Sequence, residues 1–128
     1  MRNLSKVVSC LAVALITSLV TSEARADTTV GGAITAATTW GLAGSPYIVT
    51  ADLSVGVGVT LTVAPGVTVK FNQYRLMNVY GSLAAAGTAA QPIVFTSNQA
   101  VPTAGYWNAI LFRPGSSNNQ LSYVTVSY

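Results

Sequence analysis

The stretch that decides the fold is residues 58–71, GVTLTVAPGVTVKF. In the runs 59–63 and 67–71, apolar residues alternate with threonine or lysine, so every second side chain falls on the same face. This alternation is typical of short strands with one buried face and one hydrated face. Between the runs stands Pro65-Gly66, where proline sets φ and glycine tolerates a positive φ. The stretch therefore predicts two short strands joined by a tight turn.

The same pattern returns along the chain at a spacing in the low twenties. The residues that align are Leu61 with Leu83 (22 positions), Gly58 with Gly81 (23) and Phe71 with Phe95 (24). A third copy at 110–127 is offset further, because residues 98–105 look like an inserted loop. A short period built of strands and glycine-marked turns is typical of a β-solenoid. We therefore predict an all-β fold, a right-handed parallel β-helix of about three coils. The alternative is a small antiparallel sandwich.

The interior of such a solenoid follows from its short strands. A strand of four or five residues cannot bury a core alone, but stacked coils place like residues above one another. We expect an internal stack formed by Leu61, Phe71, Leu83, Phe95 and Phe112.

Residues 1–26 have the order of a secretory signal peptide. Arg2 and Lys6 precede an apolar run at 7–20, and Ala24-Arg25-Ala26 forms an A-x-A cleavage pattern. We expect cleavage between Ala26 and Asp27. A membrane anchor is the alternative, but the run has 14 residues and a spanning helix needs about 20. The predicted location is secreted or cell surface, with the periplasm also possible, and no membrane span is expected after cleavage.

The composition of residues 27–128 argues against catalysis, metal binding and nucleic-acid binding. The whole chain is only 7% charged and has no His, and after residue 26 the only acids are Asp27 and Asp52. Glycoside hydrolysis needs two paired carboxylates, calcium prefers several oxygen ligands, and zinc prefers His and Cys. The basic residues Lys70, Arg75 and Arg113 are too few and too scattered for nucleic acid. We expect no catalytic residue, metal or cofactor here.

Aromatic residues provide the only candidates for ligand binding. They lie in or beside predicted turns and are Tyr74, Tyr80, Tyr106 and Trp107. An exposed aromatic face can stack on a sugar or mark a contact surface. The structural alternative is that Trp40 and Trp107 cover the ends of the interior stack while the tyrosines pack along strand ends. Possible partners are polysaccharide or cell-surface components.

Several stretches together resemble a known family. The stretches 45–50 (SPYIVT), 58–71, 81–83, 87–97, 107–112 (WNAILF) and 121–126 (LSYVTV) look like the opening coils of bacterial secreted right-handed parallel β-helix proteins of the pectin-lyase-like superfamily. The resemblance implies a fold found in polysaccharide-degrading enzymes, adhesins and surface proteins. It favours an exported structural or carbohydrate/surface-binding module. The alternative is a non-catalytic N-terminal fragment of a polysaccharide lyase or glycoside hydrolase.

The resemblance also suggests where the domain begins and ends. Residues 27–46 are predicted to form an N-terminal cap or lead-in, and 47–128 to form coils of a longer domain. Such relatives continue for more coils, so we expect the domain to be incomplete at its C-terminus. An open parallel edge invites pairing with other chains. Self-association through this edge is the competing expectation, in which another copy covers it.

Overall fold

The computed structural model describes residues 26–128, so the predicted signal peptide lies outside the described residues except for Ala26. The described chain contains eleven strands and one 3-10 turn, η4. Their bounds are β1 Thr28–Ile34, β2 Thr38–Trp40, η4 Leu42–Gly44, β3 Tyr47–Val55, β4 Thr60–Val63, β5 Thr68–Phe71, β6 Met77–Val79, β7 Ser82–Ala86, β8 Ile93–Ser97, β9 Ile110–Phe112, β10 Gln120–Ser122 and β11 Val124–Val126. Among these residues, no helix has the length and apolar character needed to cross a membrane.

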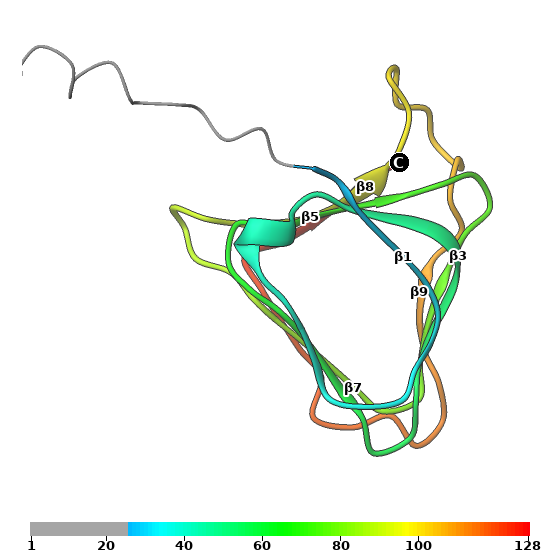
Figure 1. Cartoon of the computed structure of the whole chain (residues 1–128), viewed down its shortest axis with the longest axis vertical. Coiled ribbons are helices and arrows are strands. Elements are labelled where there is room, and N and C mark those ends of the chain that lie inside the picture. Colours follow the sequence, from blue (N-terminus) through cyan, green and yellow to red (C-terminus); the bar gives the residue numbers. More distant parts are fainter. Residues whose placement is uncertain (1–25) are drawn as a thin grey trace, which may run out of the picture.

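The strands wind into a three-sided coil, which Figure 1 shows end-on as a triangle. Every strand pairing is parallel, and the strands form two sheets, with the orders β11-β8-β5-β3-β6-β9 and β10-β7-β4-β2. β3 bends around a corner: Tyr47–Val49 pairs with β5, whereas Leu53–Val55 pairs with β6. The first face thus carries β5, β8 and β11, the second β6 and β9, and the third β2, β4, β7 and β10. The predicted all-β parallel β-helix is confirmed.

Residues 47–123 form the three coils that the sequence predicts, and the residues before them adopt the same geometry. Residues 28–46, predicted as a cap or lead-in, form a full first coil, because β1 pairs in parallel with β3 and β2 with β4. Three further coils follow at 47–67, 68–92 and 93–123, and β11 begins a fifth. The sequence pattern did not reveal the first coil, because its strands consist largely of Thr, Gly and Ala, whose side chains alternate little in size.

The register confirms one predicted alignment and corrects another. Leu61 pairs with Leu83, as the 22-residue spacing predicts. Phe71, however, pairs with Ser97, and Phe95 pairs with Val69, so the coil is 26 residues long on this face. The corners between faces differ in length, and a single spacing cannot hold for all three faces. The rings of Phe71 and Phe95 are still diagonal neighbours, with centroids 6.5 Å apart.

The core fills the inside of the triangle. Leu61, Phe71, Leu83 and Phe95 are fully buried, as expected for the internal stack. Phe112 stands above the buried Val79 at an inward position, and it is 42% exposed because no further strand of the described chain covers it. Burial of each large apolar side chain contributes about 1.5–3 kcal/mol, so the middle coils carry most of the stability.

Backbone packs directly against backbone at one corner. A Cβ on Gly81 would overlap the carbonyl oxygen of Val59, and the amide of Gly81 donates to the carbonyl of Val55 at 3.2 Å. Only glycine fits at this junction of the second and third faces, because two backbone segments approach each other closely there.

Candidate functional site

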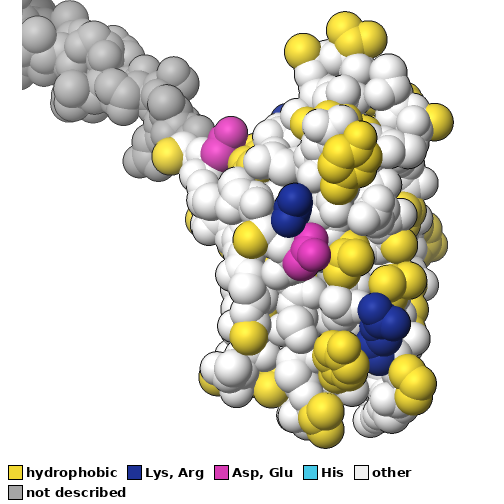
Figure 2. All heavy atoms as spheres, turned by 90° about the vertical axis from the view of Figure 1, so that its right-hand side faces the viewer, with side chains coloured by type: hydrophobic (Ala, Val, Ile, Leu, Met, Phe, Trp, Pro, Cys, Tyr) yellow, Lys and Arg dark blue, Asp and Glu magenta, His cyan; other side chains and the backbone are white. Residues whose placement is uncertain are grey.

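The corner between the first and second faces gathers aromatic, charged and amide side chains from successive coils. Successive coils contribute Asp52, then Tyr74 and Arg75, then Tyr106 and Asn108, and we call these five residues the corner cluster. Figure 2, which looks at this side of the molecule, shows an acidic and a basic side chain in contact on a largely neutral surface with scattered hydrophobic side chains.

The charged pair of the corner cluster is geometrically defined. Arg75 Nη1 lies 3.5 Å from Asp52 Oδ1, and the backbone amide of Leu76 donates to the same oxygen at 3.2 Å. Arg75 Nε also donates to the carbonyl of Gln73 at 3.2 Å. Both charged side chains remain partly exposed, at 37% for Arg75 and 51% for Asp52. The pair therefore joins two coils and still leaves hydrogen-bonding capacity facing solvent.

The two tyrosines of the corner cluster come from adjacent coils. The amide of Tyr74 donates to the carbonyl of Tyr106 at 2.8 Å, and Asn108 Nδ2 donates to the carbonyl of Tyr74 at 2.9 Å. Tyr74 has a φ of 62° and is 61% exposed, while Tyr106 is half-buried. Asn108 thus helps to hold Tyr74 in a left-handed conformation that turns the chain at this corner. The structure brings these two predicted candidates together.

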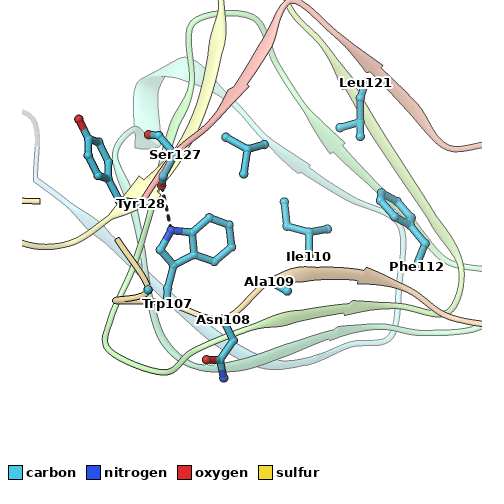
Figure 3. A pocket seen from close by; sticks show the side chains of 10 residues that line it. Trp107, Asn108, Ala109, Ile110, Phe112, Leu121, Ser127 and Tyr128 are labelled. Atoms are coloured by element: carbon cyan, nitrogen blue, oxygen red, sulfur yellow. Dashed lines mark hydrogen bonds between the residues drawn. The ribbon is translucent and has the colours of Figure 1, made fainter. Parts of the chain in front are cut away.

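Trp107 does not belong to this surface. It is 6% exposed, its ring stacks on Phe71 with centroids 4.2 Å apart, and its Nε1 donates to the carbonyl of Ser127 at 3.0 Å, as Figure 3 shows for the hydrogen bond. The buried ring cannot offer a face to a sugar. Trp40 at the other end is likewise buried and stacks on Tyr47, with centroids 4.9 Å apart. Both tryptophans match the structural alternative, in which they cover the ends of the stack.

Tyr80 lies at a different corner. It is 38% exposed, precedes Gly81 at the junction of the second and third faces, and its amide donates to the carbonyl of Val55 at 2.9 Å. The structure therefore separates it from Tyr74 and Tyr106.

The charged and polar groups of the corner cluster are few. Across residues 26–128 no group of three His, Cys, Asp or Glu residues stands close enough to hold a metal ion. Asp52 is the cluster's only carboxylate, and its Oδ1 accepts from Arg75 and the Leu76 amide. What the cluster presents is an exposed aromatic side chain beside amide, guanidinium and carboxylate groups.

Sequence reasoning missed the hollow at the C-terminal end of the coil. It has a volume of about 500 Å³ and an apolar lining that includes Ile110, Phe112, Leu121 and Val126 (Figure 3). A smaller hollow of about 310 Å³ lies at the N-terminal end, beside Trp40. In the last three strands, the register places Phe112, Leu121 and Val126 above buried residues of the coil below. Assigning this register from the sequence could have located the first hollow.

A family model described as a pectate-lyase-like beta helix domain matches residues 32–126. Comparisons with curated proteins and with solved structures found no match.

Proposed function

The chain belongs to the pectate-lyase-like beta helix domain family, and from this premise we propose that it is an exported structural or carbohydrate/surface-binding module with no catalytic apparatus of its own. The observation that carries the binding role is the corner cluster, where Tyr74 is 61% exposed beside Tyr106 and the Asp52–Arg75 pair.

The chemistry of the corner cluster suits a sugar chain. Tyrosine combines an apolar ring with a polar tip, and it stacks at little conformational cost. Ligand sites typically combine such apolar surface with a few placed polar groups, here the Asn108 amide and the Asp52–Arg75 pair. Successive coils of the β-helix contribute the residues of the corner cluster. An extended ligand could therefore run along this corner from one coil to the next.

Export rests on the segment that precedes the coils. A positive start, a 14-residue apolar run and the A-x-A pattern at Ala24–Ala26 support cleavage before Asp27. The proposed location is the cell surface or the medium, with the periplasm as a further possibility.

The test is polysaccharide binding by the product exported from the full 128-residue sequence, with its N-terminus read by mass spectrometry. Polygalacturonate serves as the acidic probe and xylan as the neutral one. Tyr74→Ala should weaken binding roughly fivefold or more, since an aromatic contact is worth on the order of 1 kcal/mol. Tyr80→Ala, the same change at another corner, is the matched control and should bind normally. Absence of binding to either probe, or equal loss in both variants, would contradict the corner site.

The second candidate is the non-catalytic N-terminal part of a polysaccharide lyase or glycoside hydrolase. The lyase-like description of the matching family favours it. Translation of the DNA beyond codon 128 separates the two: coils with clustered Asp and a basic partner indicate the enzyme, and coils rich in Thr and Asn indicate the module.

A further inference from the structure

Charges of opposite sign balance at the corner between the first and second faces. The segments of the four described coils that meet there are 31–32, 50–52, 72–76 and 98–109. Among them, only Asp52 and Arg75 carry a charged side chain. The other basic residues of the described chain belong to the faces: Lys70 lies in β5, and Arg113 follows β9 and donates from Nε to Asn78 Oδ1 at 2.7 Å. The corner is therefore neutral as a whole.

The carboxylate of Asp52 is held in place by the next coil. The backbone amide of Leu76 donates to Oδ1 at 3.2 Å, and Arg75 Nη1 lies 3.5 Å from the same oxygen. Within residues 26–128 both contacts of this carboxylate end on Oδ1, and Oδ2 accepts no hydrogen bond. Since the side chain of Asp52 is half exposed, Oδ2 is available to a ligand. An ionised carboxylate only accepts hydrogen bonds, so the ligand must bring an O–H or N–H donor.

The guanidinium of Arg75 is committed only in part. Its Nε donates to the carbonyl of Gln73 at 3.2 Å, and its Nη1 donates to Asp52. Arginine has five N–H donors, so others remain for the oxygen atoms of a ligand. Its positive charge, however, is paired. An anionic group that approaches Arg75 also approaches Asp52, so attraction and repulsion largely cancel. A neutral hydroxyl group does not meet this repulsion.

We propose that Asp52 makes the corner cluster selective for neutral sugar chains over acidic ones. The proposal rests on the sugar-binding role proposed for this cluster and adds the class of ligand. Hydroxyl groups of a neutral chain can donate to Asp52 Oδ2 and accept from Arg75, beside the exposed ring of Tyr74. A uronate chain would bring further carboxylates, which have no proton to donate to Oδ2 and are repelled by it. Asp52 is thus a specificity-determining residue, because it offsets a charge that would otherwise attract acidic chains.

Substitution of Asp52 by asparagine tests this selectivity. The side-chain oxygen of asparagine can still accept from the Leu76 amide, so Asp52→Asn removes the charge and keeps the bond between coils. Calorimetric titration at low salt compares a xylose hexamer with a galacturonate hexamer on the product exported from the full sequence. The parent should prefer the neutral hexamer. Asp52→Asn should raise the affinity for the acidic hexamer roughly fivefold, because a like charge is removed at contact distance, and should not raise the affinity for the neutral one. The gain should disappear at about 1 M salt, where screening acts within about 3 Å.

Two further variants separate a local charge effect from a general one. Val57→Lys adds the same unit of positive charge at a side chain that is 83% exposed between the second and third faces, and it should leave the preference unchanged. The double variant that combines Asp52→Asn with Arg75→Gln leaves the corner without charges. It should lose the gain for the acidic hexamer, because the unpaired Arg75 is the source of that gain. An equal gain in Val57→Lys would reduce the effect to net charge and overturn the proposal.

The outcomes distinguish this selectivity from the binding role itself. If the parent binds the acidic hexamer as tightly as the neutral one, or if Asp52→Asn brings no gain, the selectivity is refuted. The binding role then still stands, provided that Tyr74→Ala weakens binding. If the parent binds neither hexamer and neither polysaccharide, the binding role is refuted, and the selectivity is refuted with it.

Discussion

The third and fourth coils show how the same strand pattern gives different burial. In β7 every second residue is buried, and Leu83 is fully buried between Leu61 below and the next coil above. β10 stacks directly on β7, yet Leu121 is 47% exposed because no strand of the described chain lies beyond it. In a solenoid, inward orientation therefore creates a core only where a coil lies on both sides.

The two coils also differ in length. On the third face, Leu83 follows Leu61 by 22 residues, whereas Leu121 follows Ala85 by 36. Some of the extra residues form the segment between β8 and β9, where Val101 is 77% exposed. The same segment also brings Trp107 back onto Phe71, at a ring separation of 4.2 Å. The longer coil thus partly covers the end that its short strands leave open.

The largest expected effect concerns the paired leucines. Leu83→Ala should lower the free energy of unfolding by about 2–5 kcal/mol, because it opens a cavity in a fully packed interior. Leu121→Ala should cost less than about 1 kcal/mol, since the side chain is already half hydrated. Urea unfolding followed by circular dichroism measures both. Similar losses in the two variants would remove the distinction between the coils.

A smaller effect is expected at two side chains that each accept a backbone hydrogen bond between coils. Ser45 Oγ accepts from the amide of Thr68 at 2.9 Å, and Asn119 Oδ1 accepts from the amide of Leu83 at 2.8 Å. Ser45 is buried, so Ser45→Ala leaves an amide without a partner and should cost about 1–2 kcal/mol.

Asn119 is exposed, and water can replace its oxygen, so Asn119→Ala should cost about 0.5 kcal/mol. The same unfolding measurement compares the two substitutions. A greater loss of unfolding free energy for Asn119→Ala would mean that water is excluded from the amide in the last coil at least as fully as from the amide near Ser45.

The central strands were predictable because their residues alternate clearly in size and polarity. Residues 59–63 and 67–71 contain β4 and β5, and the 22-residue spacing gave the pairing of Leu61 with Leu83. The placement of Phe112 was not predictable from one period, since the register depends on corner lengths that vary from face to face. Phe112 follows Val79 by 33 residues.

The candidate site was predictable only in its residue types. Turn position identified Tyr74 and Tyr106 as aromatic candidates, but their adjacency arises across a long insertion. The same criterion included Trp107, because a buried ring and an exposed ring look alike in a turn sequence. Its stacking on Phe71 depends on the path of the segment that precedes β9.

Hydrogen exchange tests most directly the claim that strands with a coil on both sides are more stable than the edge strands of the last described coil. In dilute solution, peptides covering β9, β10 and β11 should exchange much faster than those covering β4 and β7, because edge amides open at low cost. Exchange in β9, β10 and β11 that is as slow as in β4 and β7 would contradict this division of the molecule.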